Sequence, residues 1–302
     1  MRILSRNERW FDVVNYMLLA LLAFACLYPV IMMGAISLNK GTDTMSGGVF
    51  FWPRAFTLVN YRIMLENAQL RAAYLVTISR TLLGTLGSVL VTALVAYGLS
   101  EHRLPGRKYL MVYMLIPMFF NGGLIPYYLQ LRNLHLINKF WVFIIPGLFS
   151  IWNCIVMKTF FQGIPESLKE SVRIDGASEV TVFFRIIFPL STALFAAISL
   201  FNAVGHWNDW FSGAFFVTRG ELVPVQTYLM HLMTADMSQT YSFEQQQAAA
   251  QALTRRTADY ATITSLSLRM AAVMVALLPI LVLYPFLQKY FVKGVLIGSI
   301  KE

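Results

Sequence analysis

Long apolar runs separated by shorter polar segments dominate this chain of 302 residues. Six of the runs are long enough to cross a hydrocarbon core of about 30 Å as a helix. They cover about 13–37, 72–99, 109–131, 140–160, 190–213 and 263–287. A hydrophobic fraction of 57% and a mean hydropathy of +0.60 are typical of proteins that cross a membrane several times. The pattern therefore predicts an all-α integral membrane protein with six transmembrane helices.

The polar segments predict the organisation around these spans. We expect an N-terminal segment at 1–12, a six-helix transmembrane domain at 13–287 and a C-terminal tail at 288–302. Thirteen Lys and Arg residues lie in the short segments of the face that carries both termini, and nine are spread over longer loops of the other face. The positive-inside rule therefore predicts cytoplasmic termini. The net charge of +9 is scattered over loops, which favours anionic lipid rather than nucleic acid as the partner.

The loop at 161–189 has an internal pattern of helix, break and helix, and it lies on the predicted cytoplasmic face. Pro165 suits a first helical position, and good helix formers continue to Ile174. Asp175-Gly176 then interrupts the pattern. Ser178 is a candidate cap for a second helix that Pro189 closes. A bent helix pair with both charge signs suits either a docking element or an ordinary amphipathic connector.

Polar residues within the spans are candidates for a solute pathway. Ser199, Asn202, His206 and Asp209 fall at i, i+3, i+7 and i+10, which places them on one helical face beside Trp207. The stripe suits either a wall of the pathway or hydrogen bonding between helices, and a proton relay through His206 and Asp209 is a weaker alternative. Neutral polar groups at membrane depth extend the candidate pathway: Asn121, Tyr127 and Asn153.

Three further segments carry expectations. Pro117, Asn121-Gly122-Gly123 and Pro126 predict a broken third span, in which Asn121 is a candidate cap of the break. Arg80, near the outer end of the second span, is expected to snorkel to the interface. The outer loop at 214–262 begins with an amphipathic segment at 222–233, which is expected to lie in the membrane interface.

Motifs for enzyme chemistry are missing from the sequence. It contains no Gly-x-x-x-x-Gly-Lys-Ser/Thr phosphate loop, so any dependence on ATP must come from a partner. The four histidines lack metal-ligand spacing, and no Gly-x-Ser-x-Gly elbow appears. We therefore predict a protein that is not an enzyme and holds no metal or cofactor. An intramembrane enzyme and a secondary transporter remain as alternatives.

The loop also carries a specific resemblance. Glu170, Gly176 six positions later, and Ile186 with Pro189 resemble the cytoplasmic signature of binding-protein-dependent ABC importer permeases, Glu-Ala-Ala, three residues, Gly, nine residues, Ile-x-Leu-Pro. Here Ser171 and Val172 replace the alanines, and Phe188 replaces the leucine. Other stretches resemble the carbohydrate branch related to the maltose system, and one looks like permeases for uronate-containing oligosaccharides such as alginate. These stretches are Asn60-Tyr61, 121–128, 207–210, 222–232 and 293–298.

The resemblance implies a type I ABC importer permease in the bacterial inner membrane. Its implied partners are a second permease subunit, two ATPase subunits that hold ATP and Mg, and a solute-binding protein that delivers an oligosaccharide. Loop 165–189 would then be the coupling helix that seats in the ATPase. The implied contacts with the ATPase are Glu170, Arg173, Asp175, Gly176, Ala177, Ile186 and Pro189, and in the tail Gly294, Gly298 and Ser299. A permease for a solute other than sugar is the alternative.

Overall fold

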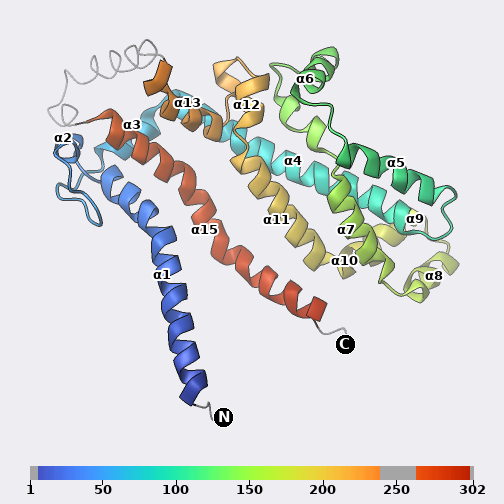
Figure 1. The fold of residues 1–302 in the computed structure, drawn as a ribbon. Helices are drawn as coiled ribbons and strands as arrows, with labels where there is room; N and C mark the ends of the chain where they lie inside the picture. The colour runs from blue at the N-terminus through green and yellow to red at the C-terminus, as the bar shows by residue number, and fades with distance from the viewer. Residues whose placement is uncertain (1–5, 239–262, 300–302) are drawn as a thin grey trace. The chain divides into compact units, whose positions relative to one another are not determined.

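A computed structural model describes residues 6–238 and 263–299 of the chain, with the side chains of 10–234 and 263–282. The described residues form helices and turns, with one isolated β-bridge between Asn39 and Phe56 and no strand among them (Figure 1). Contacts divide the chain into two units. Unit 1 comprises 1–68 and 229–279, and unit 2 comprises 69–228 and 280–302.

Unit 1 is built on buried hydrogen bonds at the end of the first span. It contains α1 (Arg6–Ser37), α2 (Gly41–Met45), α3 (Val59–Glu66) and the first part of α15 (Ser265–Ser299). The Asn60 side chain, which is 1% exposed, donates to the carbonyls of Ser37 and Asn39 at 2.9 and 3.1 Å and accepts from the Ser267 hydroxyl at 3.3 Å. A buried amide without partners would be costly in an apolar interior. The Asn60 amide has partners from three segments and therefore joins α3 to the end of α1 and to α15.

Unit 2 holds the remaining elements and the largest apolar core. Their bounds are α4 (Ala68–Ser100), α5 (Arg107–Phe119), α6 (Leu124–Asn133), η1 (Phe140–Phe143), η2 (Ile145–Gly147), α7 (Ile151–Gln162), α8 (Glu166–Ile174), α9 (Glu179–Val182), a π turn η3 (Phe183–Ile187), α10 (Phe188–Leu190), α11 (Thr192–Asn208), α12 (Phe211–Phe216), η4 (Gly220–Leu222) and α13 (Val225–Ser238), which passes into unit 1 at residue 229. Met157, Phe161, Phe183 and Ile187 are buried in its core together with Ala96. The core therefore joins α4 and α7 to the π turn η3 within the charged loop and to α11, which contributes Phe195 and Ile198.

Three of the six predicted spans are single long apolar helices, at Trp10–Ser37, Ala68–Ser100 and Ser265–Val282. The other three are helix pairs that bend at short breaks: α5 with α6 by 116°, the η1–η2 segment with α7 by 45°, and the α9–α10 segment with α11 by 84°. The described residues thus provide up to six spans if each bent pair counts as one. The boundaries differ from expectation at α1, which begins at Arg6 rather than Val13, and more at the fifth span, where the bent pair covers 179–208 rather than 190–213.

The break in the third span lies at a different place from the prolines. Pro117 lies inside α5 and Pro126 lies in the first turn of α6, so neither ends a helix. The chain turns between them, where Gly123 has a φ of +87° and its N–H donates to the Asn121 side chain at 2.8 Å. A positive φ favours glycine, which explains the turn at this point. Asn121 therefore caps the break, as expected. Its other expected role, as a residue along the solute pathway, stays a prediction.

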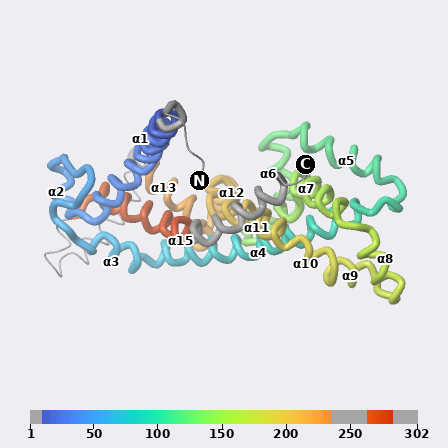
Figure 2. Tube along the Cα trace, turned by 90° about the horizontal axis from the view of Figure 1, so that it is seen from below, coloured from blue at the N-terminus to red at the C-terminus, as the bar shows by residue number. Residues whose placement is uncertain are grey.

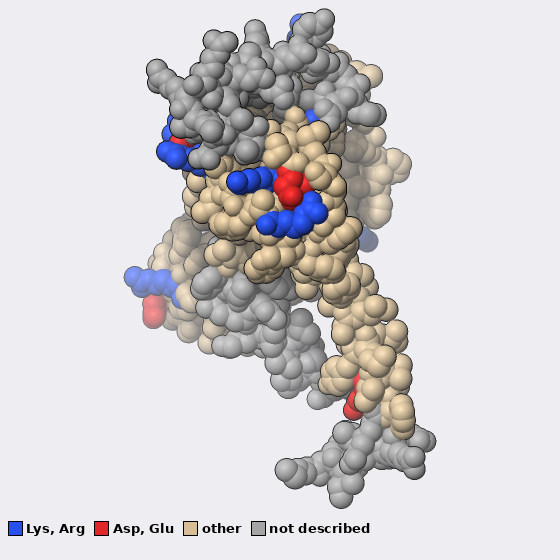
Figure 3. Space-filling model, turned by 90° about the vertical axis from the view of Figure 1, so that its left-hand side faces the viewer, with Lys and Arg blue, Asp and Glu red and all other residues tan. Residues whose placement is uncertain are grey.

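The surface is largely apolar. Figure 3 shows one face on which most described residues are uncharged, and Lys, Arg, Asp and Glu gather in a few separate groups. Large apolar side chains are widely exposed, and α5 buries none of its side chains in the chain. Such an expanse exceeds what soluble monomers expose and indicates contact with lipid or with other membrane subunits.

Candidate functional site: the charged elbow and the α4–α11 seam

The charged loop folds into a bent helix pair that we call the elbow (residues 166–190). Helix α8 begins at Glu166 and ends at Ile174, as the sequence predicts. Gly176 then has a φ of +80°, and the Ser178 hydroxyl accepts from the Thr181 N–H to cap α9. The second helix is expected to run to Arg185 and to be closed by Pro189, but it continues through η3 and α10 to Leu190, and the bend into α11 follows at Ser191.

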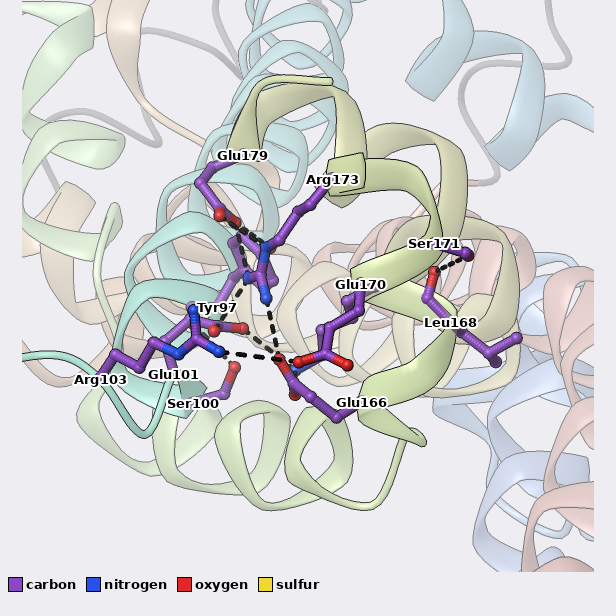
Figure 4. A network of polar contacts seen from close by, with 11 residues as sticks. Tyr97, Ser100, Glu101, Arg103, Glu166, Leu168, Glu170, Ser171, Arg173 and Glu179 are labelled. Carbon is purple, nitrogen blue, oxygen red and sulfur yellow. Dashed lines mark hydrogen bonds and ion pairs between the residues drawn. The ribbon is translucent and has the colours of Figure 1, made fainter. Parts of the chain in front are cut away.

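Arg173 is the central cation of the elbow. Its guanidinium donates to Glu179 at 2.8 Å, to Glu166 at 2.8 Å and to Glu101 at 2.9 Å. Figure 4 shows Arg173 and Glu179 pointing toward one another from the two arms of the elbow, with Glu101 approaching from the end of α4. The planar fork of arginine suits several carboxylates at once. Arg173 therefore ties both arms to each other and to α4.

Lys169 and Tyr97 complete this network. The Lys169 ammonium, whose side chain is only 3% exposed, donates to Glu101 and Glu166 at 3.0 and 3.1 Å. The Tyr97 hydroxyl of α4 donates to the Glu179 carboxylate at 2.6 Å. Buried charges persist when they are paired and hydrogen-bonded, and here each has two or more partners. In Figures 1 and 2, α8 and α9 accordingly lie beside the end of α4.

Electrostatics favour the charged forms of Glu166 and Arg173. Burial alone would raise the pKa of the Glu166 carboxyl, but hydrogen bonds from Lys169 and Arg173 outweigh it and hold the pKa below its usual value. The hydrogen bond to Glu179 raises the pKa of the Arg173 guanidinium. Burial lowers this pKa, but its effect is smaller. The stabilisation from Glu166 is therefore complete above the ordinary pKa of a glutamate and is lost as the pH falls through the lowered value.

The outer side of the elbow is free of these internal bonds. Glu170 is exposed and only 3.6 Å from Arg103, a surface pair that contributes little. Ile174 is 85% exposed, and Leu168 and Val180 are exposed apolar neighbours. A hollow of about 350 Å³ opens next to the elbow, between the turn at 101–103 and the segment at 162–166. Asp175 is exposed as well, whereas Ala177 and Ile186 are half-buried and Pro189 is exposed.

Sequence reasoning missed most of the network. It singled out Arg173 as a contact with a partner, whereas the structure turns this side chain inward, with 20% of it exposed. It did not single out Glu101, Lys169 or Tyr97 at all. A signal was present in the alternation of acidic and basic residues over 166–179, at spacings that bring side chains onto one helical face.

The polar stripe of the fifth span faces α4. Asn202 accepts from the Asn153 amide at 3.1 Å and donates to the Ser88 hydroxyl at 3.4 Å. One to two turns further along α11, the His206 ring fills the space beside Gly84, where a Cβ atom would lie 2.5 Å from Nε2. We call this contact, which runs along Ser88, Gly84 and Arg80 of α4, the α4–α11 seam.

The remaining pathway candidates divide between the seam and other places. Trp207 is buried near Tyr74, with ring centroids 6.4 Å apart, and Ser199 is half-buried on α11. Asp209 lies just beyond the end of α11 and pairs with Arg80. Asn121 and Tyr127 are exposed on the α5–α6 turn and on α6. The structure thus places Asn202 and Asn153 in bonds between helices, and whether the stripe also lines the pathway stays a prediction.

Replacing Gly84 with alanine is expected to destabilise the seam by about 1 to 3 kcal/mol, because the added methyl group overlaps the His206 ring. The measurement is the thermal unfolding midpoint of the detergent-solubilised chain. Gly98→Ala is the matched control on the same helix, since nothing lies within 4 Å of its Cβ position. An equal effect at both glycines would contradict the packing argument.

Two other predicted regions are only partly described. The segment at 222–233 is a helix from Val225 onward, and Val225 and Thr227 are fully buried, so its start is packed inside unit 2 rather than laid on a membrane surface. The backbone of α15 continues through the tail to Ser299. The surroundings of Gly294, Gly298 and Ser299, like residues 239–262 of the outer loop, lie outside the described part of the chain.

Comparisons with known proteins agree on one family of transport proteins. The family described as "Binding-protein-dependent transport system inner membrane component" matches residues 90–297. The polygalacturonan/rhamnogalacturonan transport system permease protein YtcP of Bacillus subtilis (strain 168) is 34% identical over 301 residues, which cover 98% of this chain and 99% of YtcP. The galactooligosaccharides transport system permease protein GanQ of the same organism is 28% identical, over 95% of this chain and 94% of GanQ.

A solved structure is also similar. It is a chain of a bacterial ABC transporter involved in the import of the acidic polysaccharide alginate, with a TM-score of 0.86 and 29% identity, and the match covers 96% of this chain and 100% of that one. The expected type I permease fold agrees with this likeness. The chain therefore belongs to the family of inner membrane components of binding-protein-dependent transport systems.

Proposed function

We propose that this chain is the permease subunit of an ATP-driven importer and forms half of the translocation pathway for an acidic oligosaccharide. The names of the similar proteins support the substrate class, since polygalacturonan, rhamnogalacturonan and alginate all contain uronic acids, and one of these proteins matches at 34% identity over nearly the full length. A second permease subunit supplies the other half of the pathway, and a solute-binding protein delivers the sugar.

The elbow is the observation that carries the coupling part of this proposal. A rigid, bent helix pair presents exposed Glu170, Ile174 and Asp175 on its outer side, while Arg173 fastens its inner side. We infer that a partner ATPase seats on this outer side and that Arg173 acts within the subunit. ATP and Mg are held by two such ATPase subunits, and closure of that pair moves the elbow as a rigid body.

This assignment requires the elbow and both termini to face the cytoplasm. The distribution of Lys and Arg supports that orientation. The tail residues Gly294, Gly298 and Ser299 then lie on the same side as the elbow, where they are available to the ATPase subunits. Asn121, Tyr127, Ser199 and His206 are proposed as residues along the sugar pathway.

Stimulation of ATP hydrolysis tests the substrate class. The complete transporter is reconstituted with its solute-binding protein, and oligogalacturonates, alginate oligomers and neutral galacto-oligosaccharides are added in turn. Acidic oligomers are expected to stimulate hydrolysis and uptake, and neutral ones of the same length are not. Stimulation by galacto-oligosaccharides alone would overturn the acidic class and favour a neutral substrate, which the similarity to GanQ makes the second candidate.

A further inference from the structure

Arg80 is the buried cation that the sequence misplaces. The expectation that it snorkels to the interface is wrong, because its side chain is 0% exposed and reaches across to the end of α11. Its guanidinium carbon also lies 5.1 Å from the centre of the Phe143 ring. A charged side chain held at membrane depth is costly and needs several partners to persist.

The partners of Arg80 are mostly backbone groups. Its Nη2 donates to the carbonyl of His206 and to the carbonyl of Asp209, and its Nη1 lies 3.4 Å from the Asp209 carboxylate. Helix α11 ends at Asn208, so the carbonyls of its last turn have no partner within the helix. A positive group is also favoured at a helix C-terminus by the dipole. Arg80 therefore supplies, from another helix, the cap that α11 lacks.

The break that follows is held from its other side too. Asp209 accepts from the Ser212 N–H at 3.1 Å and so starts α12, and the Thr227 hydroxyl donates to the Trp210 carbonyl at 2.7 Å. Within a span, such freed backbone groups must be satisfied by neighbouring protein. The α11–α12 break is thus a defined structure with a partner for each of these groups, rather than a frayed helix end.

We propose that Arg80 is a positioning residue for transport, which fixes the end of α11 through its backbone carbonyls rather than through the charge of Asp209. Two observations support the backbone route: Nη2 bonds two carbonyls, whereas the contact of Nη1 with the carboxylate, at 3.4 Å, is long for a charged hydrogen bond. Because Arg80 has no exposed surface, it positions the fifth span without touching the sugar. This inference rests on the transporter family alone and not on the proposed sugar.

Cysteine labelling in membranes that contain the complete transporter tests the proposal without any sugar. Ser212→Cys reports on the break, and Ala196→Cys, half-buried on the same α11, is the reference position. Cys26 is replaced by serine, and Cys154 is buried. Arg80→Gln is expected to raise the rate of maleimide labelling at position 212 by about tenfold, the scale of lost charged hydrogen bonds, and to leave position 196 unchanged.

Arg71→Gln is the matched control, because Arg71 is an exposed arginine on the same helix. It is expected to leave both labelling rates unchanged. A rise at both reporter positions in Arg80→Gln would indicate general unfolding, and no rise at either would mean that Arg80 does not hold the break. Either result overturns the proposal.

A double variant separates the backbone from the carboxylate. Uptake of oligogalacturonate is expected to fall about tenfold in maximal rate in Arg80→Gln, with an unchanged KM, and less in Arg80→Lys, which keeps the charge but not the fork. Asp209→Asn is expected to lower the maximal rate less, and the double variant Arg80→Gln/Asp209→Asn is expected to transport no faster than Arg80→Gln.

Recovery of the maximal rate in the double variant would show a simple charge pair, and a raised KM would show contact with sugar. Both outcomes contradict the proposal. If the transporter does not carry oligogalacturonate, the wild type will show no uptake either. The labelling experiment, which uses no sugar, then still tests the role of Arg80.

Discussion

Replacing Gly176 with valine is expected to remove most uptake while the chain still inserts and assembles. Gly176 has a φ of +80°, a region that costs other L-residues about 1 to 2 kcal/mol and β-branched residues more. Nothing lies within 4 Å of its Cβ position, so the cost is in the backbone and not in packing. The chain relieves it by changing the angle between α8 and α9, which moves the docking side of the elbow.

Matched variants separate these causes. Gly176→Asn is expected to retain uptake, because asparagine tolerates this backbone region, and Gly176→Ala should be intermediate. Gly106 has a φ of +72° and equally open surroundings, so Gly106→Val tests whether strain at another turn has the same effect. Uptake is normalised to the amount of subunit that co-purifies with the ATPase. Full uptake in Gly176→Val, or equal loss in Gly176→Asn, would contradict the backbone argument.

Arg173→Gln is expected to lower uptake about tenfold and to raise the ATP hydrolysed per sugar imported. The substitution leaves Glu101, Glu166 and Glu179 without their shared cation. Charged hydrogen bonds contribute about 1.5 to 3 kcal/mol, and we take the lower part of that range because two of the carboxylates are half-exposed. The elbow is then held to the end of α4 by the Lys169–Glu101 and Tyr97–Glu179 bonds alone among these polar contacts, so movement of the ATPase is transmitted less completely.

Arg173→Lys should recover part of the activity, since an ammonium keeps the charge but cannot reach three carboxylates with the same geometry. Arg185→Gln is the control on the same elbow, because Arg185 is exposed. Susceptibility to limited proteolysis across 166–190 provides a second measurement that is independent of transport. If Arg173→Gln keeps normal coupling and normal resistance to protease, the network is not what holds the elbow.

In the elbow, features that depend on neighbouring residues were predictable from the sequence, and contacts between distant residues were not. The helix start at Glu166, the break at Gly176 and the cap at Ser178 all follow from neighbouring residues, and the structure has each of them. The six apolar runs were predictable for the same reason, since each depends on about twenty consecutive residues. The direction in which Arg173 points was not, because Glu101 lies 72 positions away along the chain.

Arg80 marks the limit more sharply. Its proximity to the end of the second span favoured snorkelling, a rule that considers one helix in isolation. Its actual partners lie 126 to 129 positions later, at the end of a different helix. The third span differs, because its break lies at Asn121-Gly122-Gly123, one of the predicted signals, while Pro117 remains inside α5. For Arg80, the tertiary surroundings decided between conformations that the local sequence permits.

The exposure of α5 has a consequence for how this subunit is studied. Because most of its side chains are exposed and only a few, such as Met111 and Met114, pack partly against the core of unit 2, most substitutions along it change few contacts within the isolated subunit. Melting curves of the purified chain will therefore respond weakly to most changes in this helix, however severe their effect is in the assembled membrane complex. Mutational surveys that rank positions by the stability of the lone subunit would undervalue it.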